Sequence, residues 1–221
     1  MASVTPSASF FPINVDELVT HVGGVPGARI RLKPAPGTAT EADLLYACDH
    51  EDQLCELIDG VLVEKTVGAI ESYLAIVLSE YLTRFAREHD LGIVLGEAGM
   101  LRFSPRKIYL PDISFISWSQ NPMREMKKQS VADLHPDLAV EVISPSNSRT
   151  EMDKKRRDYF AWGVQIVWEL DPGVRLMRVY SSPEEFRTVD INGILEGETV
   201  LPGFTLPLAQ LFADVDREQG T

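Results

Sequence analysis

The sequence has few cysteines, few histidines and no long apolar run, and each shortage excludes a class of protein. Its two cysteines, Cys48 and Cys55, match neither a disulfide framework nor a zinc motif, so we expect reduced thiols. The four histidines lie far apart, which argues against a histidine-based metal or acid–base site. The longest apolar run, Tyr73–Leu78, is far below the roughly 18 residues that cross a bilayer. The beginning of the chain lacks the pattern of a secretory signal, and these features together predict a cytoplasmic location.

The chain has 221 residues, of which 44% are apolar, and this composition is typical of one folded domain. Residues 1–40 hold five of the 14 prolines and four of the 15 glycines, which predicts a loosely packed arm with a short helix near 15–21. We expect the folded domain to cover residues 41–215 and a short tail to cover residues 216–221.

The charge is strongly negative overall but unevenly distributed. A net charge of −12 argues against a protein that coats nucleic acid without specificity, because phosphate contacts need lysine and arginine. Between residues 102 and 157, however, 11 basic residues stand against 7 acidic ones. This segment could form a locally basic surface or simply a solvated helix face, and composition does not decide between them.

Hydrophobic spacing predicts a mixed α/β (α+β) fold with a central sheet. Apolar periodicity and capping residues predict helices over residues 40–48, 69–89 and 149–162. The pair Asp59-Gly60 between two apolar segments predicts a hairpin over residues 55–66. Further strands are predicted at 93–96, 100–103, 108–117, 137–144, 164–170, 174–180 and 185–189. The strand–helix–strand order over residues 137–170 indicates a βαβ unit within a sheet flanked by helices.

Two carboxylates stand in strands where acidic residues are unfavourable. Glu141 lies between apolar neighbours in the predicted strand 137–144, on the side opposite Val140 and Val142. Asp112 follows Pro111 at the start of an apolar segment. Each has an ordinary explanation, namely a buried ion pair for Glu141 and a strand-start residue for Asp112. Together they would place two oxygen ligands on neighbouring strands.

The predicted helix 149–162 adds a cation to this end of the sheet. Lys155 lies on the stripe formed by Met152 and Tyr159, and Arg156 lies on its margin, so periodicity alone does not choose between the two cations. A cation on a core-facing stripe either meets buried carboxylates or extends its apolar stem to the surface. Two carboxylates with a nearby cation suit Mg²⁺ and a phosphate substrate.

Five segments in this order resemble one protein family. They are CELIDGVLVEK, PDISF, DLAVEVISPSN, KRRDYFAWGV and VWELDP. They are similar to the Uma-two family of restriction endonucleases, within the PD-(D/E)xK nuclease superfamily, over about residues 50–215. The resemblance implies a restriction-endonuclease-like mixed sheet flanked by helices, a Mg²⁺ or Mn²⁺ cofactor and DNA as the substrate.

The resemblance also assigns roles to residues. Asp112 and Glu141 match the metal-binding residues, Lys155 before Tyr159 matches a catalytic lysine that has moved onto the helix, and Glu56 matches an additional acidic catalytic residue. Ile143 stands where the superfamily usually has its lysine. Glu97 is a weaker candidate, for which we expect a structural role.

Three functional hypotheses follow. The first is a Mg²⁺-dependent endonuclease that cleaves DNA and acts as a twofold homodimer, one active site per strand. The second is an inactive nuclease-fold protein that serves as a binding or regulatory module, and the acidic balance favours it somewhat. The third is a metal-dependent hydrolase of a smaller phosphate ester, which would need a closed pocket.

Overall fold

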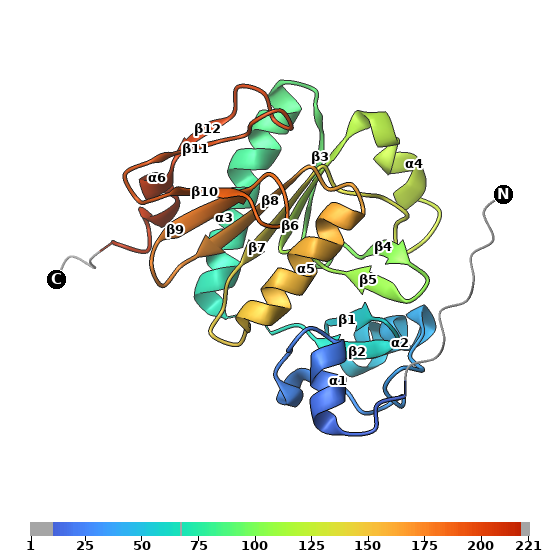
Figure 1. Cartoon of the computed structure of the whole chain (residues 1–221). Helices are drawn as coiled ribbons and strands as arrows, with labels where there is room; N and C mark the ends of the chain where they lie inside the picture. Colours follow the sequence, from blue (N-terminus) through green and yellow to red (C-terminus); the bar gives the residue numbers. More distant parts are fainter. Residues whose placement is uncertain (1–10, 67, 218–221) are drawn as a thin grey trace.

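The computed structural model describes residues 11–66 and 68–217 and has an α+β fold (Figure 1). The first ten residues of the predicted arm and the last four of the predicted tail lie outside the described residues. The helices are α1 (Val15–His21), η1 (Gly27–Arg29), α2 (Glu41–Glu51), α3 (Ala69–Glu88), η2 (Trp118–Gln120), α4 (Pro122–Met126), α5 (Arg149–Ala161) and α6 (Leu208–Phe212). The strands are β1 (Cys55–Ile58), β2 (Val61–Glu64), β3 (Gly92–Gly96), β4 (Leu101–Ser104), β5 (Lys107–Tyr109), β6 (Ile113–Ser117), β7 (Leu138–Val142), β8 (Ile166–Asp171), β9 (Leu176–Tyr180), β10 (Phe186–Val189), β11 (Ile194–Glu196) and β12 (Thr205–Pro207).

The central sheet contains the predicted βαβ unit. Its strand order is β10-β9-β8-β7-β6-β3, and β7 and β8 pair in parallel with α5 between them in the chain. The other pairs in this sheet are antiparallel, which makes the sheet mixed, as predicted. A second sheet of order β2-β1-β5-β4 lies beside it and contains the predicted hairpin.

Helices cover both faces of the central sheet, so β7 and β8 are buried on both sides (Figure 1). Helix α3 packs on the face that carries Val140, and α5 packs on the face that carries Ala139. The alternation predicted for β7 is therefore confirmed, and it places Glu141 on the α5 face.

Local chemistry explains the elements nearest to this face. Asp59 and Gly60 both have positive φ, 51° and 85°, as the tight turn of a two-residue hairpin requires. Helix α5 begins with a capping box, in which Ser148 accepts from the backbone N–H of Glu151 and the Glu151 side chain accepts from that of Ser148. Gly163, with φ 94°, follows the end of the helix in the left-handed region, where glycine is favoured.

The part of the arm that the structure describes packs more closely than its composition suggests. Leu18, Val22 and Val25 are buried in the same cluster as Tyr159 of α5. Arg29 Nη1 also lies 2.9 Å from Glu151, a pair that ties this segment to α5. Apolar contacts and one buried ion pair thus outweigh the prolines and glycines. The division of the chain at residue 40 remains a prediction.

Two further differences concern the strands. The predicted strand 108–117 is two strands, β5 and β6, separated by Leu110, Pro111 and Asp112, where the chain passes from one sheet to the other. The short pair β11–β12 was not predicted, because three-residue strands leave little periodic signal. Within the described residues, no helix is long and apolar enough to cross a membrane.

Candidate functional site

A cluster of buried charged side chains lies where the two sheets meet. Glu56 comes from β1, Glu141 from β7 and Lys155 from α5, and each is less than a tenth exposed. Lys155 Nζ lies 2.8 Å from Glu56 Oε1 and 2.9 Å from Glu141 Oε1. One ammonium therefore joins carboxylates from two different sheets, and three of the four predicted site residues are in direct contact.

Additional hydrogen bonds fix both carboxylates. The backbone N–H of Leu110 donates to Glu56 Oε1 at 3.0 Å. The hydroxyl of Tyr159, one helical turn after Lys155, donates to Glu141 Oε1 at 2.5 Å. Each carboxylate is thus oriented by more than its ion pair, which is the usual condition for keeping a charge in a protein interior.

Asp112, the fourth predicted residue, is held next to this group by another lysine. Its Oδ2 accepts from the backbone N–H of Val142 at 2.6 Å, and its Oδ1 lies 2.7 Å from Lys65 Nζ. Lys65 also donates to the carbonyl of Leu110. Ile113 pairs with Val140, so continuing the antiparallel register by one residue puts Asp112 opposite Glu141.

The cluster carries more negative than positive charge. Three carboxylates, Glu56, Asp112 and Glu141, face two ammonium groups, Lys65 and Lys155, which leaves a net charge of −1 in a buried place when all five are ionised. Burial raises the pKa of Glu141 to about 7, with Lys155 opposing the rise and Asp112 adding to it. Near pH 7 Glu141 is therefore partly protonated, and either this proton or a bound cation supplies the positive charge that the two lysines do not.

The structure resolves the alternative between the two helix cations. Both are buried, but Arg156 points to Glu169 of β8, at 2.7 Å, whereas Lys155 reaches the predicted carboxylates. Burial by itself lowers the pKa of Lys155, yet the carboxylates of Glu141 and Glu56 hold that pKa above its ordinary value. Lys155 is accordingly held in its charged form between the two carboxylates.

Sequence reasoning missed Lys65. It follows β2 directly, and the alternation of the strand places it on the same side as Val61 and Val63, which are both fully buried. Extending that alternation by one step would have directed the lysine toward the interior. The resemblance assigned no role to this position, and the hairpin was interpreted only as a turn.

The donor chemistry of the cluster suits a hard cation. Asp112 and Glu141 offer carboxylate oxygens from adjacent strands, and Mg²⁺ commonly takes one or two carboxylates with water and phosphate. A cation bound there would take the place of the proton that Glu141 holds near neutral pH. In the described part of the chain, however, no three His, Cys, Asp or Glu side chains group closely enough to hold a metal by themselves. Water and substrate oxygens would have to complete the coordination shell.

Asp112 also faces an open pocket of about 350 Å³. The pocket lies between α3 and the end of β3, and Glu97 lines it together with Asp112. Asp112 is therefore the member of the cluster that this pocket exposes. Glu97 shares the pocket, but it makes no ion pair or hydrogen bond with any described residue, and a structural role for it remains a prediction.

The fold and the family can now be stated. The mixed central sheet between helices is a restriction-endonuclease-like fold, and Asp112 just before β6, Glu141 in β7 and Lys155 in α5 lie together at one end of these strands. A solved structure from Anabaena variabilis, described as a "putative nuclease", is similar, with a TM-score of 0.65 and 21% identity over 73% of this chain and 91% of that one. At that identity the likeness shows the fold alone. No curated protein sequence matches.

Residues 40–209 match the model of the Uma2 family, which is described as "Putative restriction endonuclease". The match covers more than half of the chain, and the protein belongs to this family. The resemblance noted from the five segments is therefore confirmed, together with the fold that it implied. The roles of Glu56, Asp112, Glu141 and Lys155 stay predictions.

The raised pKa of Glu141 predicts a pH-dependent stability. The pKa rises on folding from an ordinary 4.5 to about 7, so the stabilising contribution is fully present below pH 4.5 and is lost as the pH rises through 7. Relative to Glu141→Gln, the wild-type free energy of unfolding should fall by roughly 3 kcal/mol across that window. Urea unfolding of both proteins in chelator, at several pH values, measures the difference. A difference that does not vary with pH would contradict the assignment.

Proposed function

We propose that the protein is a Mg²⁺-dependent endonuclease that hydrolyses DNA phosphodiester bonds. The observation that carries the proposal is the buried cluster in which Lys155 joins Glu56 and Glu141 beside Asp112, with three carboxylates for two ammonium groups. Membership of a family described as restriction endonucleases supports it. A cytoplasmic location and a twofold homodimer, with one site for each strand, belong to the same proposal.

In this proposal Asp112 and Glu141 would hold the metal ion. When bound, the ion would lower the pKa of a water molecule and offset the charge that develops on the phosphate. Lys155 would donate a hydrogen bond to the phosphate or to the attacking water as charge develops. Glu56 and Tyr159 would position Lys155 and Glu141, since they contact these two side chains directly.

One observation favours the inactive binding module instead. Asp112 and Glu141 each already contact a lysine ammonium, as they would in a site that has exchanged its metal for ion pairs. Against this, two ammonium groups do not neutralise three carboxylates, and a side chain as flexible as lysine can be displaced. The two hypotheses differ in whether the purified protein cleaves DNA.

Plasmid nicking tests the proposal. Supercoiled DNA should be converted to nicked and linear forms with Mg²⁺ or Mn²⁺, and should stay intact in chelator, because the carboxylates alone supply no activated water. Asp112→Asn should lower the rate at least a hundredfold. Asp133→Asn, at an exposed ion pair with Arg102 outside the cluster, is the matched control and should cleave normally.

Cleavage that survives in Asp112→Asn would indicate a contaminating nuclease or another site. Absence of cleavage in the wild type under all metal conditions, with the fold intact by circular dichroism, would favour the binding module.

A further inference from the structure

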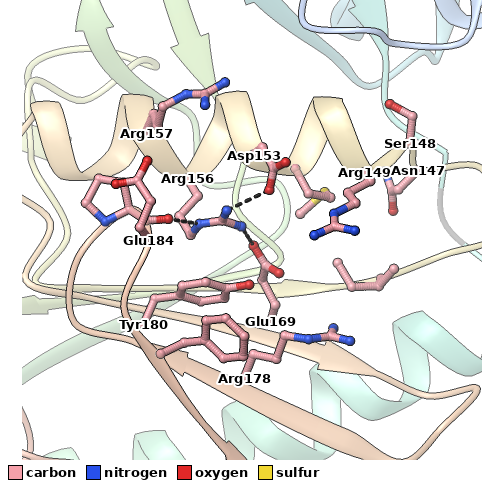
Figure 2. Close-up of a pocket in the computed structure, with 14 residues that line it drawn as sticks. Asn147, Ser148, Arg149, Asp153, Arg156, Arg157, Glu169, Arg178, Tyr180 and Glu184 are labelled. Atoms are coloured by element: carbon pink, nitrogen blue, oxygen red, sulfur yellow. Dashed lines mark hydrogen bonds and ion pairs between the residues drawn. The ribbon is translucent and has the colours of Figure 1, made fainter.

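A second and larger pocket lies beside the cluster on the same face of the central sheet. Its volume is about 600 Å³, and it is formed by the first half of α5, by β8 and β9 and by the segment that leads into β10 (Figure 2). Ile143, two residues after Glu141 on the same strand side, lines it, as does Glu169, which pairs in register with Glu141. The pocket therefore adjoins the proposed active site.

Arg156 lines this pocket, and its guanidinium group already has partners within the protein. The Arg156 guanidinium contacts Glu169 at 2.7 Å and Asp153 at 2.6 Å, and it donates to the Pro183 carbonyl. It also lies 4.1 Å from the ring centroid of Tyr180. Figure 2 shows Arg156 at the centre of these contacts. Because its donors are engaged, Arg156 shapes the pocket and is not available to a ligand.

Besides Arg156, three arginines line the pocket, and Figure 2 shows the guanidinium group of Arg157 on the other side of α5 from those of Arg149 and Arg178. Arg149 is exposed and makes no ion pair or hydrogen bond with any described residue, and Arg178 has only a 3.8 Å contact with Asp171. Figure 2 shows both guanidinium groups in the same half of the pocket. Guanidinium groups match phosphate oxygens in geometry and charge.

Arg149 stands at a position of α5 where a positive charge is unfavourable. It is the first residue of α5, where the helix dipole disfavours a cation by a few tenths of a kcal/mol or more. Nothing in the described structure compensates for this cost. A residue that weakens its own helix, yet faces a pocket next to a proposed phosphodiester site, points to a ligand.

The pocket also presents an aromatic surface. Phe186 is 51% exposed and lies 4.9 Å, centroid to centroid, from Tyr180. A half-exposed aromatic ring beside arginines is the arrangement on which a nucleotide base stacks. The acidic side chains that line the pocket do not cancel this, because Asp153 and Glu169 are already paired with Arg156, and Figure 2 shows Glu184 on the side of the pocket away from Arg149 and Arg178.

We propose that this pocket holds one unstacked nucleotide of the DNA strand, next to the phosphodiester bond that is cleaved. Arg149 and Arg178 bind its phosphate, and Phe186 stacks on its base. The inference rests on the proposed nuclease function and specifies where the strand adjoining the reaction lies.

Binding in chelator tests the inference without cleavage. The probe is a fluorescein-labelled oligothymidylate of about twelve nucleotides, followed by anisotropy over a range of salt concentrations. Arg149→Gln should weaken binding about tenfold and reduce the slope of log affinity against log salt by about 0.7. Phe186→Ala should weaken binding about tenfold with little change in slope.

Stability measurements separate this role from a structural one. Arg149→Gln should leave the unfolding midpoint unchanged or raise it, because it removes an unfavourable charge from the start of α5. Arg124→Gln, at an exposed arginine of α4 without a partner among the described residues, is the matched control and should bind like the wild type.

An affinity of Arg149→Gln and Phe186→Ala within about twofold of the wild type would overturn the inference. Failure of the wild-type protein to bind the probe at low salt would also overturn it. The proposed function fails separately: binding that depends on Arg149 in a protein that never nicks DNA would keep the pocket and reject the nuclease. Metal-dependent nicking by a protein whose binding does not depend on Arg149 would keep the nuclease and reject the pocket.

Discussion

Lys155→Met is expected to lower the free energy of unfolding by about 3–5 kcal/mol and to reduce cleavage at least a hundredfold. The stability loss follows from the contacts, because the ammonium lies within 2.9 Å of two buried carboxylates that would lose their shared partner. The loss of rate follows from the proposed role as a charged donor. Urea unfolding in chelator and plasmid nicking, at a temperature where the variant is folded, measure the two effects.

Lys154→Met is the matched control for this experiment. Lys154 is the preceding residue of α5 and is also ion-paired, but with Asp158 at 3.2 Å, outside the cluster. It should lose about 1 kcal/mol or less and keep its cleavage rate. Combining Lys155→Met with Glu56→Gln should cost less than the sum of the single changes, because one unpaired carboxylate is removed. Additive losses, or cleavage that follows only the folded fraction, would contradict the assigned role.

The reliability of prediction from the sequence differs between the elements of this site. Glu141 could be identified because it is the acidic residue of an otherwise apolar strand, and the structure places the strand's side chains on the two faces that alternation predicts. The contact between Glu141 and Lys155 could be anticipated because α5 directly follows β7 and must pack back on the sheet. Short-range patterns and the handedness of βαβ units carry this information.

Other features depend on contacts between distant segments and left no local signal. Lys155 contacts carboxylates of β1 and β7, whereas Arg156 contacts a carboxylate of β8. Helical periodicity places both side chains on the sheet-facing side of α5 and does not reveal these partners. Periodicity alone left the choice between the two cations open, and only the family resemblance favoured Lys155. The break between β5 and β6 at Pro111 likewise depends on two sheets that meet there.

The packing of residues 11–40 shows a different limit. Proline and glycine content describes the backbone of a segment but not the apolar surface that the rest of the protein offers it. Leu18 and Val25 pack in the same apolar cluster as Tyr159 of α5. Arg29 donates a hydrogen bond to Glu151, which lies 122 positions later in the sequence. An arm rich in turn residues can thus be firmly attached, and its buried arginine helps to fix the start of the helix that carries Lys155.

The second large effect is expected at Lys65, the cation that the sequence did not reveal. Lys65→Met removes the ammonium 2.7 Å from Asp112 and should lower the free energy of unfolding in chelator by about 3–5 kcal/mol. Because Lys65 occupies a position next to a proposed metal ligand, Mg²⁺ must displace it in the wild type but not in the variant. Saturating Mg²⁺, at about a hundred times its Kd, should restore about 2.7 kcal/mol to Lys65→Met and less to the wild type.

Thermal and urea unfolding with and without Mg²⁺ give both quantities independently of cleavage. Lys107→Met is the control, because Lys107 is a partly buried lysine paired with Asp158 at 2.9 Å, and its loss should not increase the stabilisation by Mg²⁺. Adding Asp112→Asn to Lys65→Met should abolish the response to Mg²⁺, since the variant keeps neither the charge nor the ligand. An equal response to Mg²⁺ in wild type, Lys65→Met and the double variant would mean that the ion binds elsewhere. Lys65 would then only neutralise Asp112.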